Sequence, residues 1–205
     1  MNISTTTFPE GYSQIEEINL KENKRLAIIL NIGAIFVAFI SFFLLSGFAA
    51  LVRPGLMNAS GSITLGMVVI LMGAYVILMT AHELIHGFFF WVFTRSRPVF
   101  GIRLLYAYAG APSWYIPNNR YAFIALGPLV TIGAVGMLLM LLVPESWVLM
   151  IIILIALNTG GSFGDILVFA RLFRLSKTCM VNDTGDAVTF FENALPFSMP
   201  GLERK

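Results

Sequence analysis

Apolar residues in this chain gather in four long stretches, and polar residues are confined mainly to the chain ends and to the segments between the stretches. Crossing the hydrocarbon core of a bilayer, about 30 Å thick, takes roughly 20 consecutive apolar residues in a helix. Four stretches reach that length: residues 26–51, 62–93, 121–143 and 147–169. Because a backbone in lipid must satisfy its own hydrogen bonds, we predict four transmembrane helices.

Two segments depart from this helical pattern. Residues 98–120, PVFGIRLLYAYAGAPSWYIPNNR, combine β-forming residues with a Gly-Ala-Pro interruption, which favours a β-hairpin or a re-entrant loop between the second and third helices. An interfacial belt of aromatic residues is the alternative interpretation. Residues 180–192, MVNDTGDAVTFFE, place a turn signal between two short apolar pieces, which predicts a small C-terminal hairpin.

The predicted fold class is therefore an all-α integral membrane protein with four transmembrane helices and two short hairpin elements. We divide the chain into an N-terminal segment (1–25), a four-helix transmembrane domain (26–175) and a C-terminal tail (176–205). The N-terminal segment is polar and lacks the basic start and short apolar core of a cleaved signal peptide, so we expect the first helix to remain as an anchor.

Composition supports a membrane protein and excludes some functions. Hydrophobic residues make up 58% of the chain and charged residues 12%, with a mean hydropathy of +0.84, whereas soluble domains are roughly one quarter charged. The formal net charge is only +2 and the basic residues are scattered. We therefore expect the lipid bilayer as a partner and no nucleic acid. The single cysteine, Cys179, cannot form a disulfide within the chain.

The basic residues indicate the orientation in the membrane. They precede the first stretch, occupy the segment between the second and third stretches, and follow the fourth: Lys21, Lys24, Arg25, Arg95, Arg97, Arg103, Arg120, Arg171, Arg174 and Lys177. The two remaining loops carry only Arg53 and Glu145. By the positive-inside rule we predict a multi-pass protein of the cell membrane with both termini and the long middle loop in the cytoplasm.

The main chemical signal lies inside the second stretch, where TAHELIHGFF places His82, Glu83 and His86 among apolar residues. The H-E-x-x-H spacing sets two imidazoles one helical turn apart, where they can bind one metal ion with the glutamate beside it as a base. Ionisable groups inside a membrane are costly, and these are the only two histidines in the chain. The alternative is a buried His-Glu pair that only contacts a neighbouring helix.

A catalytic zinc ion usually takes three protein ligands and leaves a fourth position open, so a third ligand is expected at a similar membrane depth. Apart from Glu83 and Glu145, the acidic residues lie in the polar terminal segments, with one exception, Asp165. Its depth agrees with that of His86 to within about one helical turn. The alternative is an interfacial ion pair of Asp165 with Arg171 or Arg174.

Asp165 closes the segment NTGGSFGD, residues 158–165. Its three glycines permit close backbone approach or local unwinding of a membrane helix. Asn158 lies about two turns before Asp165 and could hydrogen-bond or polarise a substrate carbonyl in the transition state. A role in helix packing is the alternative for Asn158.

These residues resemble the site-2 protease class of intramembrane zinc metalloproteases, and more closely a group of small bacterial zincin peptidase membrane proteins. The resemblance covers roughly residues 66–172 and rests on His-Glu-Leu-Ile-His at 82–86, Gly127-Pro128, and Asn158 followed by Asp165. It implies a bacterial cell membrane and zinc (Zn²⁺) bound by His82, His86 and Asp165, with Glu83 activating water. The chain departs from the family pattern in having glycines where prolines are common, and Ile166 after Asp165.

We therefore predict a zinc metalloprotease that hydrolyses a peptide bond of a membrane protein or peptide substrate near the cytoplasmic face, with Glu83 as general base. Residues 99–109 could offer a strand edge to an unwound substrate segment. Two alternatives stay open: a non-catalytic metal-binding scaffold or metal-handling protein, and a metal-dependent lipid hydrolase. Glu83 favours the enzyme, because a structural zinc site needs no base.

Overall fold

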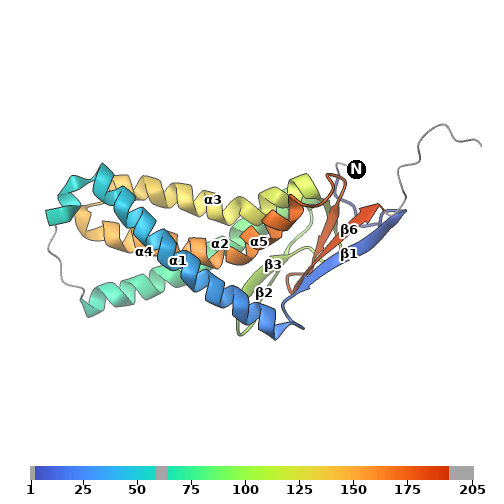
Figure 1. Cartoon of the computed structure of the whole chain (residues 1–205), viewed down its shortest axis with the longest axis horizontal. Helices are drawn as coiled ribbons and strands as arrows, with labels where there is room; N and C mark the ends of the chain where they lie inside the picture. The colour runs from blue at the N-terminus through green and yellow to red at the C-terminus, as the bar shows by residue number, and fades with distance from the viewer. Residues whose placement is uncertain (1–2, 59–63, 194–205) are drawn as a thin grey trace, which may run out of the picture.

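The computed structural model describes residues 3–58 and 64–193 and shows a bundle of long helices with a small β-sheet at one end (Figure 1). Its α-helices are α1 (Lys24–Val52), α2 (Leu65–Thr94), α3 (Asn118–Leu142), α4 (Glu145–Gly161) and α5 (Phe163–Leu172). A 3-10 turn, η1 (Pro54–Asn58), follows α1. The strands are β1 (Tyr12–Asn19), β2 (Val99–Ile102), β3 (Ala107–Gly110), β4 (Tyr115–Pro117), β5 (Met180–Asp183) and β6 (Ala187–Asn193).

Three helices of the described chain, α1, α2 and α3, are each long and apolar enough to cross a membrane, and α4 with α5 makes a fourth span if the bent pair is counted as one. The predicted stretches 26–51 and 121–143 correspond to α1 and α3. The stretch 62–93 corresponds to α2, and its first two residues lie outside the described part. Large apolar side chains such as Ile35, Phe36 and Ile77 are exposed on the outer faces, where lipid would solvate them.

The fourth stretch, 147–169, was predicted as one helix and is instead broken. α4 ends at Gly161, α5 begins at Phe163, and the two are bent by 47°. At the break the hydroxyl of Ser162 donates to the carbonyl of Asn158 over 3.0 Å. A Cβ at Gly160 would collide with the backbone oxygen of Ala34, so this glycine lets α4 approach α1 closely. The glycines permit both close approach and a local break, and both occur here, although the sequence predicted one continuous helix.

The all-α class is only partly correct, because strands form two sheets. β2 and β3 pair as an antiparallel hairpin between α2 and α3, and β5 and β6 pair as an antiparallel C-terminal hairpin, as predicted. The sequence did not predict β1 and β4. They complete an antiparallel sheet of order β1-β6-β5-β4, in which β1 from the N-terminal segment pairs with β6 near the end of the described chain.

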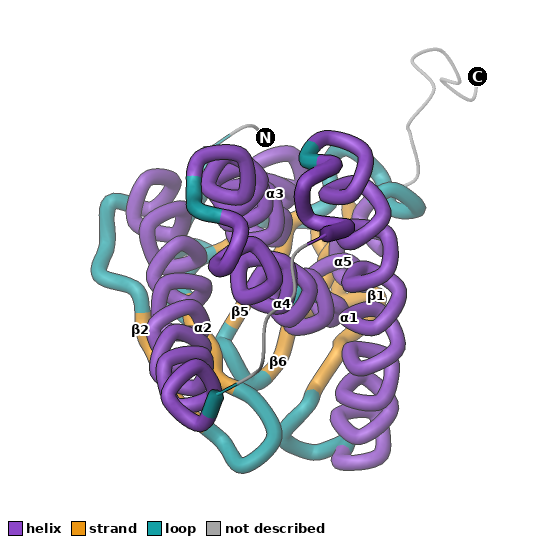
Figure 2. Tube along the Cα trace, turned by 90° about the vertical axis from the view of Figure 1, so that its left-hand side faces the viewer, coloured by secondary structure: helices purple, strands orange, loops and turns teal. Residues whose placement is uncertain are grey.

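A buried apolar cluster joins this sheet to the helix ends. Phe90 of α2, Tyr121 and Ile124 of α3, and Val181 and Phe190 of the sheet are all at most 4% exposed and lie in one cluster. The cluster fixes the last turns of α2 against α3. Seen along the bundle, α1 and α2 stand on opposite sides of α4 (Figure 2), so the space between them is bounded by α4, α5 and the strands.

Candidate metal centre

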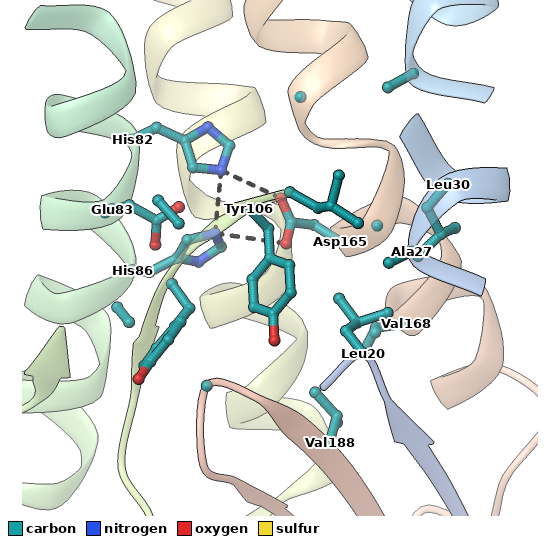
Figure 3. A pocket seen from close by; sticks show the side chains of 18 of the residues that line it. Leu20, Ala27, Leu30, His82, Glu83, His86, Tyr106, Asp165, Val168 and Val188 are labelled. Carbon is teal, nitrogen blue, oxygen red and sulfur yellow. Dashed lines mark hydrogen bonds and ion pairs between the residues drawn. The ribbon is translucent and has the colours of Figure 1, made fainter. Parts of the chain in front are cut away.

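Three predicted ligands, from two helices, meet in the interior of the bundle. His82 and His86 lie one turn apart on α2 and are 3% and 8% exposed, and Asp165 lies in the first turn of α5, just after the break (Figure 3). The Nε2 atoms of the two histidines are 3.2 Å apart. The carboxylate of Asp165 lies 3.3 Å from Nε2 of His82 and 3.5 Å from Nε2 of His86. Among the described residues, these three form a group that could hold a metal ion.

The spacing of these atoms fits zinc. Zinc binds imidazole nitrogens and carboxylate oxygens at about 2.0–2.2 Å, and atoms at that distance in a tetrahedral site are about 3.3–3.5 Å from one another. The two Nε2 atoms are 3.2 Å apart, Oδ2 of Asp165 lies 3.3 Å from Nε2 of His82, and Oδ1 of Asp165 lies 3.5 Å from Nε2 of His86. Two imidazoles and one carboxylate are also a donor set that zinc takes in catalytic sites.

Hydrogen bonds to the outer ring nitrogens fix the orientation of both histidines. Nδ1 of His86 lies 2.9 Å from the backbone oxygen of Ile124, and Nδ1 of His82 lies 3.0 Å from Oδ1 of Asn158. Both partners are acceptors, so each Nδ1 carries the hydrogen, and each Nε2 of a neutral ring presents a lone pair to the centre. Two lone pairs and the Asp165 carboxylate would repel one another unless a cation lies between them. This arrangement is suited to a metal ion.

Glu83 lies beside this group and is not one of its three members. It follows His82 on α2, its side chain lines the same cavity as both histidines (Figure 3), and the backbone amide of Ala109 on β3 lies next to its carboxylate. The position is that of a carboxylate able to exchange a proton with a molecule bound at the centre.

A cavity of about 590 Å³ is lined by Glu83 and by the three candidate metal ligands, His82, His86 and Asp165. Its wall includes Ile35 of α1 and Tyr75 of α2, which are 70% and 39% exposed, so the cavity reaches the outer surface between these two helices. Gly164, next to Asp165, also lines it, and a Cβ there would meet no other atom within 4 Å. Free space therefore adjoins the centre on the α5 side.

Residues of the loop between β2 and β3 line this cavity. Arg103 donates two hydrogen bonds to the carboxylate of Asp186, at 3.0 and 2.6 Å, and the hydroxyl of Tyr106 donates a third at 2.9 Å. On the other side, Asn31 of α1 donates to the backbone oxygen of Leu105 over 3.3 Å. The loop is thus tied to both the β5–β6 turn and α1. The sequence did not predict this contact, since each partner lies in a different local pattern.

Burial and hydrogen bonds shift the pKa values of Tyr106 in this loop and of Asp186 and Asp183 beside it. The hydrogen bonds from Arg103 lower the pKa of Asp186, so the carboxylate stays charged. Burial, with the neighbouring Asp186, raises the pKa of Tyr106 to about 12, so the phenol stays a donor. Asp183, at the end of β5, accepts hydrogen bonds from the hydroxyl of buried Tyr121 and from the backbone amide of Gly185. Burial raises the pKa of Asp183 to about 6.

Asn158 is fully buried, and its oxygen faces His82. Its Nδ2 atom has no hydrogen-bond partner among the described residues. The proposed contact with substrate stays a prediction. Of the two arginines considered as partners of Asp165, Arg171 instead forms an ion pair with Glu16.

The fold and the donor group define a class: a mostly helical protein with helices that can span a membrane and a histidine–carboxylate group suited to zinc. A family model described as "putative zincin peptidase" matches residues 75–180, more than half of the chain. The chain therefore belongs to this family, whose cofactor is zinc. The matched segment includes both histidines, Glu83 and Asp165. No curated protein and no solved structure matches the chain.

Proposed function

We propose that this protein is a zinc-dependent intramembrane peptidase of the site-2 protease type, which cuts a membrane protein near the cytoplasmic face. In this proposal His82, His86 and Asp165 bind the zinc ion. The main supporting observation is that these three side chains converge in a cavity that reaches the outer surface of the bundle.

In the proposed hydrolysis, the zinc ion and Glu83 have separate roles. Zinc, when bound, supplies Lewis acidity, which makes water nucleophilic near neutral pH and polarises a carbonyl. Glu83 takes a proton from the attacking water as its oxygen bonds to the carbonyl carbon, and gives a proton to the amine as the C–N bond breaks. Because Glu83 lies beside the donors without being one, its position favours a catalyst over a structural metal site.

Two features support a substrate that comes from the membrane. The cavity opens between α1 and α2, whose outer faces carry exposed apolar side chains. The β2–β3 hairpin also ends in exposed Ile102 and Leu104, at 86% and 100%, as expected for a hairpin in the lipid interface. In the described part of the chain β2 pairs only with β3, which leaves an edge where an extended peptide could add a strand.

Metal removal tests the proposed function. Purified protein in detergent is expected to contain one zinc per chain, to cut single-span membrane proteins, to lose cleavage on treatment with a chelator and to regain it with zinc but not magnesium. Metal analysis and mass spectrometry of the products are the measurements. Phospholipid hydrolysis without peptide products would show a lipid hydrolase. Stoichiometric zinc with neither activity would favour the scaffold.

Asn158→Ala is expected to lower zinc affinity about 10- to 100-fold, because the outer hydrogen-bond partner of a histidine ligand orients the ring. Competition with a chelator of known affinity measures the effect. Thr159→Ala is the matched control, since the hydroxyl of Thr159 donates to the carbonyl of Ile155 in its own helix. Unchanged zinc affinity together with a lower kcat would instead assign Asn158 to the substrate, as the sequence suggested.

A further inference from the structure

Pro128 lies inside α3, near the metal centre, and its side chain is fully buried. Proline has no backbone N–H, so it cannot donate to the carbonyl four residues earlier in a helix. In α3 that carbonyl belongs to Ile124. A carbonyl freed in this way inside a membrane protein needs another donor, which a neighbouring helix can supply.

The donor in this structure is a proposed zinc ligand. The backbone oxygen of Ile124 lies 2.9 Å from Nδ1 of His86, a contact that crosses from α3 to α2. Because a carbonyl can only accept, this contact holds the hydrogen on Nδ1 and leaves the lone pair of Nε2 directed at the centre. The residue at position 128 therefore influences His86 through the backbone carbonyl of Ile124.

Gly127 allows the two helices to come close enough for this contact. A Cβ at Gly127 would collide with the ring of Phe89, which lies on α2 less than one turn after His86. The Gly-Pro pair thus has two effects. Gly127 lets α2 pack closely against α3, and Pro128 leaves the carbonyl of Ile124 free to accept a hydrogen bond from another helix.

We propose that Pro128 is a positioning residue for the zinc site, which acts by leaving the Ile124 carbonyl available to His86. The inference rests on the proposed function in that His86 is taken as a ligand. It goes further by giving the Gly-Pro pair in α3 a chemical role: the missing N–H, and not the bend that proline causes, is what the site uses.

Pro128→Ala tests this inference because alanine restores the N–H. The new donor shares the Ile124 carbonyl, weakens its bond to His86 and is expected to lower zinc affinity about tenfold, within the range for an outer partner of a ligand. The thermal unfolding midpoint is expected to stay the same or rise, since alanine favours a helix. Pro54→Ala, at the exposed start of η1, is the control substitution and should leave zinc affinity unchanged.

An ester at position 128 separates the missing N–H from the bend. Incorporation of lactic acid, the α-hydroxy analogue of alanine, gives the alanine side chain without either the ring or the N–H. Zinc affinity close to that of the wild type is expected for this variant. An ester variant that binds zinc as weakly as Pro128→Ala would overturn the proposal, and so would a Pro128→Ala protein with wild-type affinity.

Histidine NMR gives a readout that needs no metal. The chain has two histidines, so selective ¹⁵N labelling of the ring reports only this site. In metal-free protein, the ring signals of His86 are expected to show hydrogen on Nδ1 in the wild type and in the ester variant, and a shift toward the Nε2–H form in Pro128→Ala. Identical spectra for all three would refute the inference. A wild type that binds no zinc would refute the proposed function, and the spectra would still decide the role of Pro128.

Discussion

Glu83→Gln is expected to leave zinc bound and to lower the rate of peptide cleavage by about 10²- to 10⁴-fold, the usual range for loss of a general base. Glutamine has nearly the same shape as glutamate but cannot take up a proton from water. Glu83 lines the cavity beside the donors without belonging to the donor group. The zinc content should therefore not change. The measurements are kcat on a single-span membrane substrate and zinc per chain.

Glu10→Gln is the matched control, because Glu10 is exposed and lies in the N-terminal segment, far along the chain from the site. It should cleave like the wild type. Cleavage by Glu83→Gln at the wild-type rate would show that Glu83 is not the base. Loss of zinc from Glu83→Gln would instead show that Glu83 is a ligand.

Asp165→Ala is expected to abolish stoichiometric zinc binding and to reduce cleavage to background. Asp165 supplies the one negative charge among the three donors, and its removal leaves two imidazoles, one ligand short of the three that a catalytic zinc usually has. The loss of affinity should exceed the roughly 100-fold limit expected for an outer partner such as Asn158. His86→Ala should give the same result. Metal analysis after dialysis against a weak chelator measures both.

Arg174→Gln is the control for Asp165. The sequence left open an interfacial ion pair between Asp165 and Arg171 or Arg174, and such a pair would make the aspartate structural. Arg174 is exposed, and its variant should keep its zinc and its activity. If Asp165→Ala were folded by size-exclusion chromatography and still held one zinc per chain, the proposed third ligand would be wrong.

The spanning helices could be predicted from the sequence because their signal is local. A helix in lipid needs a run of apolar residues of a certain length, and each run in this chain carries that information by itself. The C-terminal hairpin was predictable for a similar reason, since the turn residues around Gly185 interrupt two short β-forming pieces. The turn of the β2–β3 hairpin, at residues 103–106, was not predicted, because the Gly-Ala-Pro interruption that begins at Gly110 follows β3. The spacing of His82, Glu83 and His86 is also local, because four residues make about one turn of a helix.

The break at Ser162 and the strand β1 could not be predicted from local sequence patterns. Glycines in NTGGSFGD allow a break but do not require one, and the break depends on how closely α4 packs against α1 at Gly160. β1 has little apolar alternation, and it is ordered by pairing with β6, nearly the whole chain length away. Pairings between distant segments leave little trace in the local pattern of either one.

By itself, the sequence determined which segments can cross a membrane and which residues can bind a metal. The tertiary structure decided how those residues meet: the break between α4 and α5 sets Asp165 opposite His82 and His86, and the Ile124 carbonyl on α3 orients a histidine on α2. The physical reason is that hydropathy and helical spacing are properties of neighbouring residues. A metal site, by contrast, needs atoms from separate helices within about 3.5 Å of one another, and only packing between those helices sets that distance.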